Sequence, residues 1–340
     1  MHGIFKDREI KRVFIIGAGF SAPFGMPLTD KILALVYEIA LAQPLEGEQY
    51  GQASRLLKEL QRYFPTMEIT HELIQSGKLQ IDVEQFLSYV CAVSAFGENF
   101  ADGDDLFVCL LRSWIGEAIY KAQCECFLKP IPFQYLSFVQ SLRGSMILTF
   151  NWDTIIEELL GRAEKSYVFD FHSAFQTEAV PLIKLHGSVD WFSDPHPFNR
   201  DWMCHVPISE HNPGIVRAKG KFSQYRNYGC HPLIVVPSYD KINRVKSLGS
   251  IWETPWFYLQ DELEVVIIGF SMRPDDYHSR AVIYPQLVHG SRKGHLKIKV
   301  IDFADNDDYK NEIRKRYDGV ENCRFWFEGF SGNVQDFIEN

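Results

Sequence analysis

Residues 12–30 read RVFIIGAGFSAPFGMPLTD, and this stretch decides the fold. An apolar run at 12–17 ends in a Gly-Ala-Gly turn, and apolar residues at helical spacing begin at Leu28. A buried strand that leads through glycines into a helix is typical of dinucleotide-binding turns, because glycine lets the backbone approach a pyrophosphate and the helix N-terminus adds partial positive charge. The same layout is also typical of a plain strand-to-helix turn, so the stretch alone leaves both interpretations open.

Further short apolar runs predict the rest of a sheet. Helical patterns separate most of these runs, which is typical of an α/β fold whose sheet is covered on both faces. We therefore expect a doubly wound, Rossmann-like parallel sheet within a single domain over residues 1–340. The expected strands are residues 12–17, 146–150, 182–185, 233–236, 264–269 and 296–302.

Two regions depart from the alternation of strands and helices. Between about 45 and 145, apolar residues such as Val83 and Phe86 recur at helical spacing, which predicts a helical insertion. Residues 191–232 are rich in Pro, His, Gly, Asn and aromatic residues, and this stretch is longer than most connections inside a domain. We expect an irregular loop or small subdomain there, of the kind that often covers a site.

Composition excludes several classes of protein. Hydrophobic residues make up 46% of the chain and charged residues 23%, which are ordinary values for a globular protein. The net charge of −9 disfavours direct binding of nucleic acid, because Lys and Arg contacts to phosphate supply most of that affinity. No apolar run approaches the roughly 18 to 20 residues of a membrane helix, so we expect a cytoplasmic protein that does not bind membranes. The seven scattered cysteines do not predict a disulfide framework.

Polar residues follow two further expected strands. Asn151 and Asp153 come directly after the run at 146–150, and His186 follows the run at 182–185. Taken singly, Asn and Asp at such a junction are ordinary helix N-caps, and a lone histidine is usually structural. Because ligands collect outside the carboxyl ends of parallel strands, however, we expect these residues to share one crevice with the glycine turn.

Two later strand ends carry candidate binding residues. Gly269 ends the run at 264–269 and Ser271 follows it, and the run at 296–302 ends in Asp302, a carboxylate suited to a ribose or an adenine. Each of these ends is typical of a plain turn when it is taken singly. A hydride-transfer enzyme of Rossmann type would place a second strand, with an acidic ribose ligand, about 20 residues after the glycine turn. The helical region stands there instead, which disfavours a dehydrogenase.

The combination of motifs resembles the sirtuin superfamily, and most closely the sirtuin-like proteins of bacterial antiphage defence. The resemblance covers most of the chain in the family's order. The matching residues are Gly17-Ala18-Gly19-x-Ser21 with Gly25-x-Pro27, then Thr149-Phe150-Asn151-Trp152-Asp153, His186-Gly187 and Gly269-Phe270-Ser271. The resemblance implies NAD as the substrate and Asn151 and His186 as the catalytic residues. With Asp302 added, the expected NAD-binding residues are Gly17, Ala18, Gly19, Phe20, Ser21, Pro27, Asp153, Gly269, Ser271 and Asp302.

Two departures from the protein deacylases of this superfamily disfavour acyl-lysine substrates. Those enzymes carry Asp-Phe-Arg after the proline, whereas this chain has Leu28-Thr29-Asp30 and lacks the basic residue. They also carry a four-cysteine zinc module after the His-Gly motif, whereas this region contains Cys204 and Cys230 alone. Each of these cysteines precedes a histidine, and two Cys-His pairs are chemically able to bind zinc. We expect no metal, because adjacent residues rarely both point at one ion.

The resemblance implies cleavage of the nicotinamide–ribose bond, with water as the acceptor in place of acyl-lysine. Asn151 would orient water or a ribose hydroxyl, His186 would act as general base or ribose-hydroxyl partner, and Asp153 would lie near the carboxamide. The implied activity is an NAD hydrolase that depletes NAD in antiphage defence. Two alternatives remain open: an NAD-dependent deacylase or ADP-ribosyltransferase, and a non-catalytic module that binds NAD or ADP-ribose.

An unrestrained NAD hydrolase would harm its own cell, so the implied activity requires control. The chain leaves no room for a large sensor domain. We therefore expect a homo-oligomer, or a partner protein such as the ATPase, helicase or Argonaute-like proteins of related defence systems.

Overall fold

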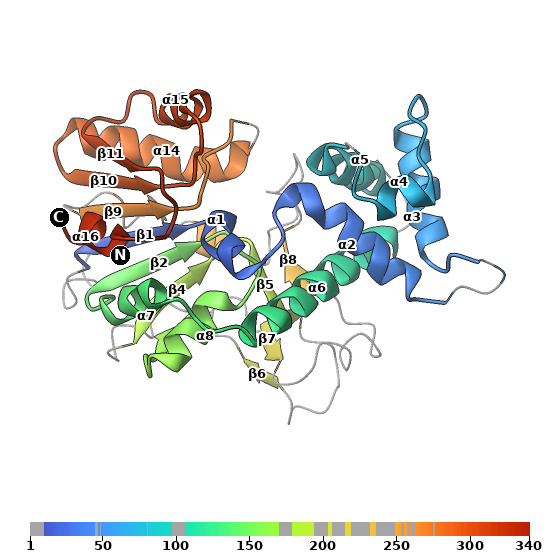
Figure 1. Ribbon diagram of the computed structural model, residues 1–340, viewed down its shortest axis with the longest axis horizontal. Coiled ribbons are helices and arrows are strands. Elements are labelled where there is room, and N and C mark those ends of the chain that lie inside the picture. Colours follow the sequence, from blue (N-terminus) through green and yellow to red (C-terminus); the bar gives the residue numbers. More distant parts are fainter. Residues whose placement is uncertain are drawn as a thin grey trace.

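A seven-stranded, entirely parallel sheet lies on the left in Figure 1. The computed structural model describes residues 10–44, 47, 49–79, 81–96, 106–169, 179–193, 203–205, 215–218, 232–235, 249–252, 255–256, 259, 263–274 and 276–340. In their order across the sheet, the strands are β11 (Cys323–Trp326), β10 (Leu296–Ile301), β9 (Leu263–Ile268), β1 (Arg12–Ile16), β2 (Ser145–Thr149), β4 (Val180–Lys184) and β3 (Tyr167–Val168).

The order of the strands creates a switch point beside β1. After β1 the chain builds β2, β3 and β4 on one side, and it then returns to pair β9 with the free side of β1. Residues of β2 and β4 are all buried, as expected of parallel strands with helices on both faces. In such sheets, ligands bind outside the carboxyl ends of the strands where the order reverses. Here that place lies at the ends of β1 and β9.

Helices cover both faces of the sheet, which confirms the doubly wound α/β fold. Helices α14 (Tyr277–Arg292) and α15 (Asp307–Arg316) lie on one side, and α7 (Phe133–Gln140) and α8 (Ile155–Arg162) lie on the other (Figure 1). Helix α16 (Val334–Glu339) packs against α7. None of the helices in the described ranges has the length and apolar character that crossing a bilayer requires.

A group of helices extends away from the sheet. Helices α2 and α6 pack against each other, and three further helices lie beyond them on the right of Figure 1. Their bounds are α2 (Thr29–Leu41), α3 (Ala53–Tyr63), α4 (His71–Gln75), α5 (Val83–Phe96) and α6 (Leu106–Phe127). These elements occupy most of the region expected to be helical, although its status as an insertion with boundaries at about 45 and 145 stays a prediction.

A second, antiparallel sheet of four strands follows β4 in the chain. Its strands, in spatial order, are β6 (Met203–His205), β7 (Ile215–Ala218), β5 (Gly187–Ser193) and β8 (Pro232–Ile234). The expectation that residues 233–236 belong to the parallel sheet is therefore wrong. β8 pairs with β5, and Val235 N–H donates to His186 O at 2.9 Å just beyond that pair. A short apolar run looks the same in either kind of sheet.

Candidate functional site

The glycine turn leads into a short helix rather than directly into the long one. α1 (Ala18–Ser21) is only four residues long, a 3₁₀ turn follows it, and α2 begins at Thr29. Pro23 offers no N–H, and Gly25 adopts a left-handed φ of 100°, so the chain turns before α2 begins. The expectation that the long helix adds its dipole to the glycine turn is therefore wrong, since α1 aligns only one turn of peptide groups.

The glycines allow two turns to meet backbone to backbone. Gly17 N–H donates to Ile268 O and Gly19 N–H donates to Gly269 O, both at 2.9 Å. A Cβ at Gly17 would lie 2.5 Å from Gly269 O, and a Cβ at Gly19 would lie 2.7 Å from Gly269 Cα. Gly269 itself adopts a φ of 59°. The glycines are therefore required first for packing at the switch point, and this packing brings the β1 and β9 ends together.

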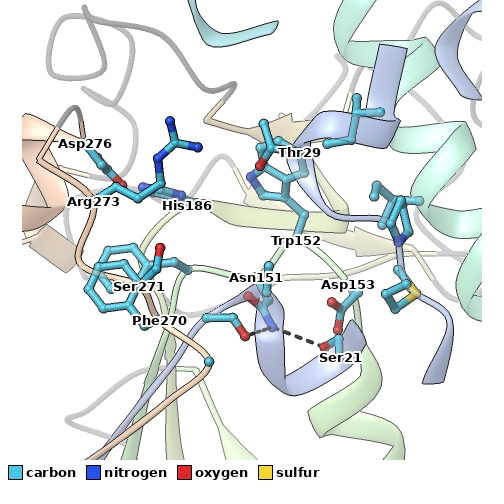
Figure 2. Close-up of a pocket in the computed structure, with 18 of the residues that line it drawn as sticks. Ser21, Thr29, Asn151, Trp152, Asp153, His186, Phe270, Ser271, Arg273 and Asp276 are labelled. Carbon is cyan, nitrogen blue, oxygen red and sulfur yellow. Dashed lines mark hydrogen bonds between the residues drawn. The ribbon is translucent and has the colours of Figure 1, made fainter. Parts of the chain in front are cut away.

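Asn151 joins the end of β2 to this turn. Its Nδ2 donates to Gly17 O at 3.0 Å and to Ser21 Oγ at 3.2 Å (Figure 2). Its backbone N–H donates to Thr149 Oγ1 at 3.1 Å, so both the side chain and its peptide are fixed. Because Nδ2 faces the glycine turn, the planar amide directs Oδ1 away from it. This side chain does not cap a helix.

Asp153 has a structural role in addition to its place in the site. Its Oδ1 accepts from Ile155 N–H at 3.0 Å, at the start of α8, although the N-cap residue of that helix is Thr154 rather than Asn151 or Asp153. The residue is only 7% exposed. Burial raises the pKa of the Asp153 carboxyl, and the nearby Lys184 ammonium offsets part of this shift.

A buried ion pair supports the Asn151–Asp153 loop from beneath. Lys184, at the end of β4, is fully buried, and its Nζ donates to Glu157 Oε1 at 2.7 Å. The same ammonium donates to Asp153 O at 2.5 Å. The sequence analysis missed this pair, although a lysine inside the apolar run at 182–185 was a visible signal. A charge in that position requires a partner.

His186 is packed on several sides. It is 8% exposed, its ring forms a T-shaped pair with Phe150 at 5.0 Å between centroids, and the ring of Trp252 of α12 (Gly249–Trp252) lies 5.5 Å away. Its Nε2 lies 3.3 Å from Ser279 Oγ, within hydrogen-bond distance. Ser279 lies in the first turn of α14, where its N–H is capped by the carboxylate of Asp276 at 3.3 Å. The imidazole is thereby held by a helix on the far side of the switch point.

Most of the predicted site residues line one cavity of about 180 Å³. They come from the ends of β1, β2, β4 and β9, so the structure brings together segments far apart in the chain. The predicted residues that line it are Gly17, Ala18, Ser21, Pro27, Asn151, Asp153, His186, Gly269 and Ser271. In Figure 2, Arg273 and Asp276 lie beside His186, and Ser21 lies beside Asp153.

Gly19 and Asp302 line a second cavity of about 800 Å³. Asp302 Oδ1 accepts from Phe303 N–H at 2.8 Å, whereas its Oδ2 is buried with no hydrogen-bond partner among the described residues. Burial raises the pKa of this carboxyl. The two cavities share a wall formed by Ala18, Thr29, Gly269, Ser271 and Arg273.

Phe20 lies apart from both cavities, although we expected it among the binding residues. Its side chain is 1% exposed and packs against Tyr135, Phe138 and Phe330. The Phe20 ring therefore belongs to the core. The Cys204–His205 and Cys230–His231 pairs lie outside the residues whose side chains the structure describes.

Several residues of the first cavity were not predicted. Arg273 and Asp276 belong to the loop after β9, and their signal was the polar stretch that follows Ser271. Glu84 of α5 and Ile119 of α6 reach the cavity from the helical region. No local pattern distinguishes these two from other helix residues, because only the tertiary fold brings them to the sheet.

Comparisons with known proteins add little to this description. No family model and no curated protein matches the chain. Among solved structures, it is similar to that of Sir2Tm bound to a propionylated peptide, with 10% identity and a TM-score of 0.37. The match covers 97% of this chain and 92% of that chain. The functional assignment therefore rests on the geometry of the two cavities.

Proposed function

We propose that the chain is an NAD hydrolase, which cleaves the nicotinamide–ribose bond to give nicotinamide and ADP-ribose. One observation carries this proposal. Asn151 and His186, from the ends of two different strands, line the same cavity as the glycine turn, at the switch point of a parallel sheet. Dinucleotides bind at such places in doubly wound folds, and an amide beside an imidazole there is suited to work on a ribose.

The presence of two cavities that share a wall supports a ligand with two halves, such as a dinucleotide. Sites that enclose a drug-sized ligand measure about 300 to 1,000 Å³. The first cavity, at about 180 Å³, is smaller than this, whereas the second measures about 800 Å³. A ligand with two nucleoside halves would place its nicotinamide riboside in the first and its adenosine in the second. Asp302 Oδ2 would then accept a hydrogen bond from the adenosine half, which removes the cost of an unsatisfied buried oxygen.

The chemistry of the bond suits the groups in the first cavity. Nicotinamide is a pyridinium in NAD and leaves as a neutral ring, so the leaving group needs no proton. Positive charge develops on the ribose instead, and Asn151 Oδ1 supplies a negative dipole where that charge arises. His186 takes the proton of the attacking water. The carboxylates of Glu84 and Asp153 also line this cavity and favour a cationic ring.

The decisive experiment measures NAD cleavage by the purified protein. Nicotinamide and ADP-ribose should appear in equal amounts by liquid chromatography, and Asn151→Ala and His186→Ala should each reduce the rate by about 10²- to 10⁴-fold. Asn311→Ala and His289→Ala, at exposed positions on α15 and α14, serve as matched controls. Full activity in both site variants would refute this mechanism.

The same assay separates the alternatives. Incubation with NAD and an acetylated peptide, followed by mass spectrometry, detects deacylation or transfer of ADP-ribose to the peptide. Binding of NAD without turnover, in the presence of every partner, would indicate a regulatory module.

The cellular role that we propose is depletion of NAD during phage infection, restrained by self-assembly or by a partner protein. The resemblance of the four motifs to sirtuin-like defence proteins supports this role. Light scattering with and without NAD tests for assembly. NAD consumption measured with and without the products of neighbouring genes tests for an ATPase, helicase or Argonaute-like partner.

A further inference from the structure

Arg273 lies on the wall that the two cavities share. Among the described residues that line either cavity, it is the only lysine or arginine. The other ionisable groups around them are mainly acidic: Glu84, Asp153 and Asp276 line the first cavity, and Asp302 and Glu328 line the second. A ligand that carries negative charge between its halves would meet repulsion from these carboxylates. Arg273 supplies positive charge at the wall that the two cavities share.

The backbone beneath Arg273 is held in a conformation that a non-glycine residue rarely adopts. Met272, which precedes it, has a φ of 47° and is 1% exposed. Such a conformation persists only where the surroundings impose it, and it is concentrated at ligand sites.

Side chains hold this conformation by donating hydrogen bonds to three consecutive backbone carbonyls. Each carbonyl of residues 270–272 receives a hydrogen bond from a side chain of α14, or from one at the end of α15. The donors are Tyr317 Oη to Phe270 O at 3.0 Å, Arg316 Nη1 to Ser271 O at 3.0 Å and Arg280 Nη1 to Met272 O at 3.2 Å. The Cα of Arg273 is thereby fixed before any ligand arrives.

We propose that Arg273 binds the pyrophosphate of the dinucleotide, an inference that rests on the proposed function. The phosphates join the two nucleoside halves, so they must cross the wall between the two cavities, where this guanidinium lies. A guanidinium binds phosphate oxygens through paired, charge-assisted hydrogen bonds. Since the loop is fixed in advance, little backbone entropy is lost on binding. The deacylases that the motifs resemble carry a basic residue after Pro27 that this chain lacks, and Arg273 places a cation in the site from a different element.

Binding measurements with ADP-ribose test the proposal without reference to turnover. By titration calorimetry, Arg273→Gln should weaken ADP-ribose binding by about 10- to 100-fold, and Arg273→Lys should weaken it less, because lysine keeps the charge but not the paired donors. Binding of adenosine, which has no phosphate, should not change in either variant when it is followed by ligand-observed NMR. Arg292→Gln, at an exposed position on α14, is the matched control.

Each result has a distinct meaning. Equal affinity of the wild-type protein and Arg273→Gln for ADP-ribose would overturn this inference and leave the proposed function standing. A parallel loss of adenosine binding would also overturn it, since the residue would then only shape the loop. A wild-type protein that binds no ADP-ribose and cleaves no NAD would refute the proposed function itself. Should Arg273→Gln not fold, an ADP-ribose affinity of Arg273→Lys equal to that of the wild-type protein would likewise count against the inference, because the paired donors of the guanidinium would then contribute nothing.

Discussion

The two sides of the switch point fix the residues of the site in different ways. At the ends of β2 and β4, side chains are fixed individually: Asn151 by the glycine turn, and His186 by Ser279 and two aromatic rings. At the end of β9, the backbone is fixed instead, through its carbonyls. A side chain that takes part in a reaction needs a defined orientation, whereas a long side chain that binds a ligand needs only a defined backbone position. The two sides are therefore suited to chemistry and to binding, respectively.

The substitution with the largest expected effect breaks the contact between the turns that follow β1 and β9. In Gly269→Ala, the new methyl group would lie 2.4 Å from Gly19 C at a φ of 59°, so the β1 and β9 turns must separate. We expect a loss of about 3 to 5 kcal/mol in the free energy of unfolding, measured with denaturant. Gly294→Ala is the control, because it has a similar φ of 73° with nothing within 4 Å. A cost equal to that of the control would show that the two turns do not depend on close contact.

Lys184→Met removes the support from the side suited to chemistry. It leaves Glu157 buried without its cation, and we expect a cost of about 3 kcal/mol in the free energy of unfolding. NAD cleavage should fall further than ADP-ribose binding, because the Asn151–Asp153 loop loses its anchor. The double variant Lys184→Met with Glu157→Leu should recover part of the stability, since no charge remains buried. A double variant less stable than Lys184→Met alone would contradict this account.

Ser279→Ala tests whether α14 orients His186 across the switch point. We expect a fall in kcat of about tenfold, with KM for NAD almost unchanged, because a single hydrogen bond to the imidazole is lost. The pH dependence of kcat should also change, which a merely structural effect would not produce. Ser279→Thr, which keeps the hydroxyl, should restore the wild-type pH profile. Identical profiles for the alanine variant and the wild type would remove Ser279 from this role.

Asp302→Asn has the smallest expected effect on stability, and it tests the role of this carboxyl in the second cavity. Burial raises the pKa of this carboxyl, so the folded protein holds its proton to a higher pH than the unfolded chain does. Its ionisation therefore costs stability as pH rises from the unfolded pKa through the folded pKa, and the cost persists at neutral pH. Asp302→Asn should raise the free energy of unfolding at pH 7 by less than about 1 kcal/mol, with no gain at about pH 3.

The same substitution should weaken binding of adenosine and ADP-ribose alike. Asparagine keeps one acceptor but loses the charge, so we expect about a tenfold effect by calorimetry. Unchanged adenosine binding would place Asp302 outside the adenosine half of the site.

Sequence reasoning placed candidate residues correctly in the fold where they follow directly after a buried strand of the parallel sheet. The ends of β1, β2, β4 and β9 were visible as short apolar runs followed by small or polar residues, and the parallel sheet brings those ends together. It failed at β8, because a short apolar run does not reveal whether its neighbour is parallel or antiparallel. β11 also went unrecognised, since only four residues form it and none of them is fully buried.

The rest of the site depends on contacts that no local pattern encodes. Glu84 and Ile119 reach the first cavity from helices that are remote in the chain, and Ser279 reaches His186 across 93 positions. The glycines show a subtler limit. The sequence does not distinguish a glycine that lets a phosphate approach from one that lets two backbones touch, and Gly17, Gly19 and Gly269 are needed for the second reason.

The first cavity is not built by the sheet alone. Glu84 of α5 and Ile119 of α6 form part of the wall of the first cavity, and α6 packs along α2 far beyond the strands. A displacement of the outer end of that helical pair would therefore be transmitted to the first cavity, where the glycosidic bond is proposed to break. A force or a bound molecule that shifted these helices would therefore change the shape of the first cavity without entering it.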